Sequence, residues 1–187
     1  TVSKVDDVTD VDSWVNIPNV KAIWINSPCN PTGEVISADW LADIVAAARR
    51  IGAVVLSDEC YALMDWRSAR NTTSRPAAAS NEPAFDAAFS LSATPCALNQ
   101  QVCEGSADGI LVLYSLSKQS NMAGYRTALI AGDYRLVAEM GEYRKQIGQI
   151  IPGPVQAAMA AGLNDAGSVY AQWNRYRGRL VALVDAL

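Results

Sequence analysis

Histidine is absent from the 187 residues of this chain. Its absence excludes Ser-His-Asp and Cys-His catalysis, which use histidine as the base, and it disfavours a catalytic zinc site, in which histidine is a usual ligand. Any catalysis must therefore use lysine, aspartate, glutamate, tyrosine or an organic cofactor. We predict no metal site in this chain.

Cysteine and long apolar runs are also scarce. The four cysteines form no C-x-x-C pair, which favours free thiols in a reducing compartment over a disulfide scaffold. No apolar run reaches the roughly 18 residues that a membrane span needs, and residues 1–20 lack the charged-then-apolar pattern of a signal peptide. The net charge of -4 disfavours nucleic acid and anionic membranes as partners. We therefore expect a cytoplasmic protein.

Four short apolar runs predict the strands of a sheet: 21–26 (KAIWIN), 53–57 (AVVLS), 110–114 (ILVLY) and 127–131 (TALIA). The runs are continuous rather than alternating, which is typical of strands buried on both faces of a parallel sheet. Between the first two runs lies an amphipathic helix, with Ser37 as its N-cap and Gly52 as its stop. This order predicts an α/β fold with a mostly parallel sheet and flanking helices.

The other segments carry weaker patterns. Residues 67–108 are rich in Ala, Ser, Asn and Pro, and because long structureless loops are uncommon we expect a hidden helix or a surface excursion there. Three helices are expected after the fourth run. Pro154 opens the second and Ser168 caps the third, while the first has an apolar stripe of Leu136, Met140, Tyr143 and Ile147.

Polar clusters follow the first three apolar runs: "NSPCNPTG" (26–33), "SDECY" (57–61) and "SLSK" (115–118). Ligands of open α/β sheets bind beyond the carboxyl ends of the strands, so we expect these clusters to lie at one edge of the sheet. Each cluster alone has an ordinary structural explanation as a turn, a helix cap or a solvated strand end. Their joint position favours a binding site.

The residue types in these clusters suit pyridoxal phosphate. A lysine amine can form a Schiff base with the cofactor aldehyde. A carboxylate that faces the pyridine nitrogen keeps it protonated, so that the ring withdraws electrons from the substrate. Phenol and amide donors can stabilise the ring oxygen, and hydroxyls with a guanidinium suit a phosphate dianion.

These motifs, with "SLSKQSNMAGYR" at 115–126, resemble those of the fold-type-I pyridoxal-phosphate aminotransferases of class I and II. The resemblance extends over essentially the whole chain. It implies that the lysine of the Schiff base is Lys118, that Asp58 faces the pyridine nitrogen, and that Tyr61 and Asn30 donate to the ring oxygen. It also implies three phosphate ligands: Ser115, Ser117 and Arg126.

Within this family, "IAGD" (130–133) and "PGPVQAAM" (152–159) look most like the succinyldiaminopimelate aminotransferases of lysine biosynthesis. That resemblance implies amino-group exchange between N-succinyl-diaminopimelate and 2-oxoglutarate, with small-molecule substrates and a homodimer. It further implies that residues 1–166 are part of an aspartate-aminotransferase-like large domain. Residues 167–187 would begin a helix leading to a small domain outside this chain.

Several alternatives remain open. Ser115 and Lys118 also match the Ser-x-x-Lys motif of penicillin-binding enzymes, but the S-D-N and K-T-G elements that this reading needs do not occur. Another class I/II aminotransferase or a pyridoxal-phosphate lyase would use the same cofactor, which does not by itself select the reaction. A cofactor-sensing transcriptional regulator without turnover would keep this fold downstream of a DNA-binding extension.

Overall fold

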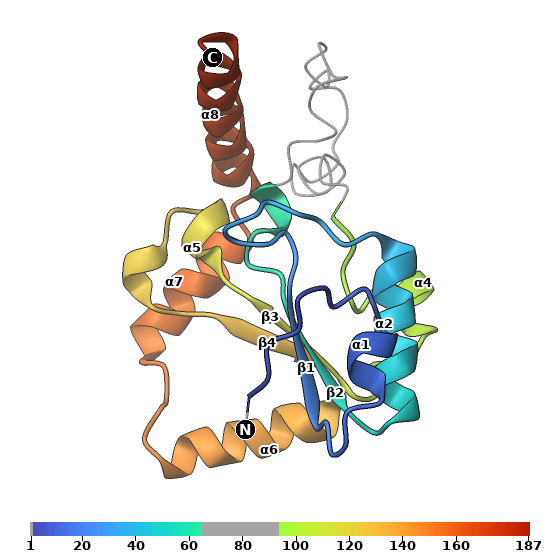
Figure 1. Cartoon of the computed structure of the whole chain (residues 1–187). Helices are drawn as coiled ribbons and strands as arrows, with labels where there is room; N and C mark the ends of the chain where they lie inside the picture. Colours follow the sequence, from blue (N-terminus) through green and yellow to red (C-terminus); the bar gives the residue numbers. More distant parts are fainter. Residues whose placement is uncertain (1, 65–93) are drawn as a thin grey trace. The chain divides into compact units, whose positions relative to one another are not determined.

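The computed structural model describes residues 2–64 and 94–187 (Figure 1). The chain divides into two compact units. The first holds the described residues of Thr1–Glu59 together with Pro95–Tyr114 and Leu129–Ile150. The second holds those of Cys60–Thr94 together with Ser115–Ala128 and Ile151–Leu187.

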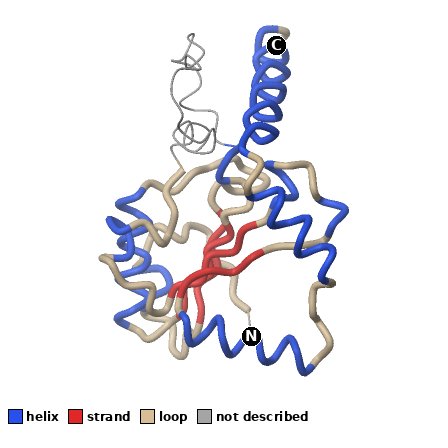
Figure 2. The backbone as a smooth tube through the Cα atoms, turned by 180° about the vertical axis from the view of Figure 1, so that it is seen from behind, coloured by secondary structure: helices blue, strands red, loops and turns tan. Residues whose placement is uncertain are grey.

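The first unit is built on a four-stranded sheet in the order β1-β2-β3-β4, whose strands lie side by side in Figure 2. The strands are β1 (Ala22–Asn26), β2 (Val54–Asp58), β3 (Ile110–Tyr114) and β4 (Leu129–Gly132). β1, β2 and β3 pair in parallel, whereas β4 is antiparallel to β3. The predicted α/β fold with a mostly parallel sheet is confirmed.

Three helices of the first unit lie together beside this sheet in Figure 1: α1 (Asp12–Val15), α2 (Ala38–Arg50) and α4 (Gln100–Cys103). Their apolar side chains form one buried core with those of the strands, including Trp14, Ile23, Ile25, Leu41, Ile44, Val55, Val102, Ile110 and Val112. Each fully buried side chain of this kind contributes roughly 1.5–3 kcal/mol. The core therefore holds the three parallel strands in place.

The predicted ends of α2 are confirmed. The hydroxyl of Ser37 accepts a hydrogen bond from the backbone N–H of Trp40 at 3.2 Å, as an N-cap does. Gly52 follows the last turn with a φ of +68°, a conformation that glycine adopts without strain.

The expectation that the strands are buried on both faces is wrong for β1 and also for β4, whose four residues are all half-buried. Ile23 and Ile25 face the core, but Trp24 between them is 59% exposed. β1 lies at one edge of the sheet that the described residues form, and the core covers one of its faces. A continuous apolar run does not distinguish this half-covered strand from a fully buried one.

The junction between β4 and the helix that follows it lies very close to β3. Gly132 has a φ of +139°, and a Cβ at this position would overlap the carbonyl oxygen of Ile110. Asp133 then caps α6 (Tyr134–Gln146) and also accepts a hydrogen bond from the N–H of Gly109 at 3.0 Å. That bond is the main reason that the pKa of Asp133 lies below its ordinary value.

The first of the predicted helices is thus confirmed as α6, but its apolar stripe is not a buried one. Tyr143 is 65% exposed, and Ile147 lies just beyond the last helical residue. Leu136 and Met140 are half-buried. Among the described residues, the helix therefore buries only part of the face that the sequence pattern indicated.

The second unit comprises short and long helices: η1 (Ala62–Met64), α5 (Leu116–Gln119), η3 (Ala123–Tyr125), α7 (Gly153–Leu163) and α8 (Ala166–Asp185). α5 packs against η1, α7 and α8. The approach of α7 to α5 is close, because a Cβ at Gly162 would lie 2.9 Å from side-chain atoms of Leu116 and Met122. A glycine at this position lets α7 hold the short α5.

Two helix starts in this unit were predicted, and one is wrong. Pro154 lies in the first turn of α7, as expected. Ser168 does not cap α8, because the carboxylate of Asp165 accepts the backbone N–H of Ser168 at 3.0 Å and starts the helix three residues earlier. Hydrogen bonds from Ser168 lower the pKa of Asp165.

The segment 67–108 is described only from residue 94 onward. That part contains the expected hidden helix, α4, and the rest of the segment lies outside the described residues. None of the described helices combines the length and the apolar character that crossing a membrane requires.

Arg49, in the last turn of α2, holds the loop that follows α4. Its guanidinium donates hydrogen bonds to the carbonyl oxygens of Cys103 at 3.1 Å, Ser106 at 2.6 Å and Asp108 at 3.3 Å. An Arg49→Met substitution keeps the apolar stem and loses these bonds, so we expect the free energy of unfolding to fall by about 2 kcal/mol. Chemical denaturation measures the change.

The neighbouring Arg50 provides the matched control because its side chain is exposed. Arg50→Met should leave the denaturation midpoint nearly unchanged. Equal losses in the two variants would contradict the role assigned to Arg49.

Candidate functional site

Asp58 is the last residue of β2 and pairs with Asn26 in β1 and Leu113 in β3. Its carbonyl oxygen accepts hydrogen bonds from the backbone N–H of Ser27 and from the side-chain amide of Asn26, both at 3.2 Å. The residue itself is half-buried. Asp58 therefore sits in the central strand of the parallel part, at the carboxyl edge that the sequence predicted.

The "NPTG" turn is tied to the same edge through Asn26. The backbone N–H of Asn30 donates to Asn26 Oδ1 at 2.9 Å, while the amide of Asn26 donates to Asp58. The turn closes with a 2.8 Å bond from the N–H of Gly33 to the carbonyl of Cys29. Asn26 thus joins the turn to the end of β2. Sequence reasoning gave it no role, although it is the final residue of the first apolar run.

In the second unit, Lys118 and Tyr61 lie together. The amine nitrogen of Lys118 is 5.2 Å from the centroid of the Tyr61 ring, within the range of a cation–π contact. Lys118 is exposed on α5, and Tyr61 immediately precedes η1. A primary amine and a phenol that are far apart in the sequence are therefore neighbours in this unit.

Ser115 and Ser117 form a hydroxyl pair at the start of α5, with their oxygens 2.7 Å apart. The Ser115 hydroxyl caps α5 by accepting the N–H of Ser117, and it donates to the carbonyl of Thr127 at 3.1 Å. Because a hydroxyl has a single proton, the bond to Thr127 uses the only proton that the buried Ser115 hydroxyl can donate. The half-buried hydroxyl of Ser117 is then the one better able to turn toward a ligand.

Arg126 follows η3 and is exposed. Its φ of +51° is uncommon for a residue with a long side chain. The guanidinium donates one hydrogen bond, at 3.0 Å, to the carbonyl of Ala123. Among residues 2–64 and 94–187, no acidic side chain forms an ion pair with this guanidinium.

A second carboxyl, Glu59, is buried beside Asp58 in the first unit. Its Oε1 accepts hydrogen bonds from the hydroxyl of Ser57 at 2.9 Å and from the N–H of Ala97 at 2.8 Å. The thiol of Cys96 also interacts with this carboxyl. Burial raises the pKa of Glu59, and burial together with the nearby Glu59 raises the pKa of Cys96 to about 12. Sequence reasoning took Asp58 and Tyr61 from "SDECY" and missed Glu59.

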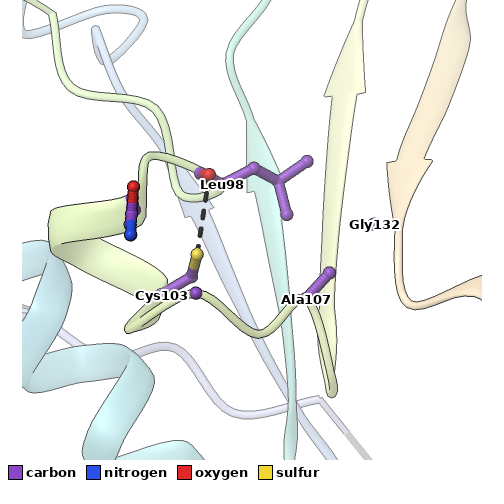
Figure 3. Close-up of a pocket in the computed structure, with 6 residues that line it drawn as sticks. Leu98, Cys103, Ala107 and Gly132 are labelled. Carbon is purple, nitrogen blue, oxygen red and sulfur yellow. Dashed lines mark hydrogen bonds between the residues drawn. The ribbon is translucent and has the colours of Figure 1, made fainter.

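A cavity of about 460 Å³ opens elsewhere in the first unit (Figure 3). It is lined by Leu98, Gln100, Cys103, Gly105, Ala107 and Gly132, and in Figure 3 the thiol of Cys103 bonds to the carbonyl of Leu98 at 3.5 Å. None of the described residues that line it is charged or belongs to the predicted site. The cavity is therefore not the candidate site.

The predicted residues supply the groups that pyridoxal phosphate needs. The first unit offers a half-buried carboxylate, Asp58, and the second offers an exposed amine beside a phenol, a pair of hydroxyls and an exposed guanidinium. This set contains a partner for the aldehyde, the pyridine nitrogen, the ring oxygen and the phosphate of that cofactor. The chemistry of the donors fits the group.

Comparison with known proteins gives the family. A sequence model of "Aminotransferase class I and II" matches residues 6–187. The chain is 42% identical over 168 residues to a 4-dedimethylamino-4-oxo-anhydrotetracycline transaminase of Streptomyces rimosus, covering 90% of this chain and 40% of that protein. It is 39% identical over 165 residues to a Mycobacterium tuberculosis protein named as a probable aminotransferase, covering 88% of this chain and 34% of that protein.

Among solved structures, the N-succinyldiaminopimelate aminotransferase of Mycobacterium tuberculosis matches with a TM-score of 0.68 and 26% identity. The match covers 94% of this chain and 40% of that one. The chain thus spans well under half the length of the relatives that it matches.

The two serines of the hydroxyl pair should differ in their effect on stability. Ser115→Ala removes the cap of α5 and the bond to Thr127, so we expect the free energy of unfolding to fall by about 1 kcal/mol. Ser117→Ala removes only the contact between the two hydroxyls. It keeps both bonds of the Ser115 hydroxyl to the main chain, so it should change stability little. Thermal unfolding of the two variants measures the difference, and a larger loss for Ser117→Ala would contradict this division of roles.

Proposed function

Because the chain belongs to the class I and II aminotransferases, a family that depends on pyridoxal phosphate, we propose that it carries the cofactor-binding part of a transaminase. The approach of the Lys118 amine to the Tyr61 ring, at 5.2 Å, is the observation that supports the proposal most directly. A lysine that binds the cofactor needs an accessible amine, and Lys118 is exposed with the Tyr61 ring beside its amine. The position of Asp58 at the carboxyl edge of β2 is consistent with the same role.

When bound, pyridoxal phosphate supplies an electron-withdrawing ring that stabilises negative charge on the substrate. Lys118 would hold the cofactor through its amine and carry the proton at the substrate Cα. Asp58 would keep the proton on the pyridine nitrogen. Tyr61 and Asn30 would donate hydrogen bonds to the ring oxygen, and the phosphate would be bound by Ser115, Ser117 and Arg126.

For the substrate, we propose exchange of an amino group between N-succinyl-diaminopimelate and 2-oxoglutarate, as in lysine biosynthesis, by a cytoplasmic homodimer. The "IAGD" and "PGPVQAAM" motifs and the fold match to an N-succinyldiaminopimelate aminotransferase support this choice. A second candidate is a ketone of the anhydrotetracycline type, which is favoured by the higher identity to the Streptomyces rimosus transaminase.

The surroundings of Ser115 argue against the penicillin-binding alternative. A nucleophilic serine needs a free hydroxyl next to a base. Ser115 is only 8% exposed. Its hydroxyl caps α5 and donates to the carbonyl of Thr127. These contacts support a structural role for the Ser115 hydroxyl rather than nucleophilic attack.

The cofactor attachment can be tested in the full-length protein by borohydride reduction followed by peptide mass mapping. We expect the mass of the cofactor on the peptide that contains Lys118. Lys118→Ala should lose this label and reduce transamination by roughly 10²–10⁴-fold or more, because both attachment and proton transfer are lost.

Lys145→Ala is the matched control, since Lys145 is an exposed lysine that pairs with Glu142 at 2.9 Å on the surface of α6. It should keep both the label and the activity. Label on another lysine, or full activity of Lys118→Ala, would refute the assignment.

The two substrate candidates are separated by steady-state kinetics with glutamate as the amino donor. We expect kcat/KM for the keto form of N-succinyl-diaminopimelate to exceed that for an oxo-anhydrotetracycline by at least about tenfold, or about 1.4 kcal/mol in transition-state stabilisation. The reverse order would favour the second candidate. An enzyme that retains the cofactor but accepts neither would contradict both.

A further inference from the structure

Glu59 is a buried carboxyl to which the proposed function gives no role. It follows Asp58 directly, so the two side chains leave the end of β2 on opposite faces of the sheet. Glu59 shares its face with Ser57, and these residues are only 4% and 1% exposed, whereas Asp58 is half-buried. The face of Glu59 is the one that the core covers.

The carboxyl of Glu59 connects β2 to a segment distant in sequence. It accepts one hydrogen bond from Ser57 on its own strand and one, at 2.8 Å, from the N–H of Ala97 in the Pro95–Ala97 segment. The thiol of Cys96 in that segment lies near enough to interact with it. A buried carboxyl of this kind is tolerated only when donors surround it, and here they come from both sides of the connection.

The backbone next to Glu59 is fixed by the neighbouring strands. The N–H of Glu59 donates to the carbonyl of Leu113 at 3.0 Å, and the carbonyl of Asp58 accepts from Ser27 at 3.2 Å. The peptide bond between Asp58 and Glu59 is thus held by β3 on one side and by the residue after β1 on the other. The side chain of Glu59 adds a third attachment, toward the core.

We propose that Glu59 is a positioning residue for Asp58: by anchoring the Pro95–Ala97 segment to the end of β2, it fixes the direction in which the Asp58 carboxylate is presented to the cofactor ring. The inference rests on the proposed function, because it takes Asp58 as the partner of the pyridine nitrogen. Glu59 itself faces the core and does not touch the cofactor. The strand end thus carries one carboxyl for structure and one for chemistry.

The test compares Glu59→Ala with Glu59→Gln in the full-length protein, with Glu139→Ala, an exposed carboxylate on α6, as the control. Glutamine keeps an acceptor oxygen for Ala97 and Ser57, whereas alanine leaves both donors unpaired. Hydrogen exchange of the Ala97 amide measures whether residue 59 still holds the Pro95–Ala97 segment, and this measurement needs no cofactor. In Glu59→Ala we expect exchange to accelerate by about tenfold or more, as for a buried N–H that loses its acceptor.

The absorbance band of bound pyridoxal phosphate reports on the orientation of the Asp58 carboxylate. In Glu59→Ala we expect the band to shift and the dissociation constant of the cofactor to rise by about tenfold, with both restored in Glu59→Gln and unchanged in Glu139→Ala. Fast exchange at Ala97 with an unchanged cofactor band would overturn the inference, because Glu59 would then be structural only. Failure of glutamine to restore the band would also overturn it.

If Glu59→Ala does not fold, Ser57→Ala provides a milder variant, since it removes one donor to Oε1 and leaves the carboxyl in place. It should shift the band in the same direction by a smaller amount, and an unshifted band would count against the inference. If the wild-type protein bound no pyridoxal phosphate, the proposed function would fail and the cofactor part of the inference with it. The exchange of Ala97 would still decide whether Glu59 anchors the segment.

Discussion

The arrangement of the candidate site depends on the parallel pairing of β1, β2 and β3 at their carboxyl ends. At this edge the carbonyl of Asp58 accepts from Ser27, and the N–H of Glu59 donates to Leu113. Parallel strands all end on the same side of a sheet, and each of the three polar motifs begins within the last two residues of one of these strands or directly after it. A shift of β2 by one residue would turn Asp58 toward the core and Glu59 away from it.

Much of the fold could be predicted because its signals are local. The four apolar runs became the four strands, and Ser37, Gly52 and Pro154 mark helix ends as their types indicate. Other features depend on which elements pack together. Trp24 is exposed because the described core covers one face of β1, and Asp165 rather than Ser168 caps α8 because both residue types are good caps and geometry selects one.

In the candidate site, too, the sequence predicts the local motifs but not how the residues pack. The motif residues could be found from their order and spacing, and Lys118 with Tyr61 and Ser115 with Ser117 are indeed neighbours. The sequence could not distinguish the roles of the two adjacent acids at the end of β2. Their burial and contacts do so, because Glu59 is enclosed by donors from Ser57 and Ala97 while Asp58 remains half-buried on the other face. The substrate also lies beyond the sequence motifs, since residues that form the cofactor site do not select it.

The most direct test of the central claim is a crystal structure of the full-length protein with pyridoxal phosphate bound. We predict that a carboxylate oxygen of Asp58 lies about 2.7–3.2 Å from the pyridine nitrogen while the amine of Lys118 is bonded to the cofactor. A ring nitrogen that faces another side chain, with Asp58 turned to solvent, would contradict the account.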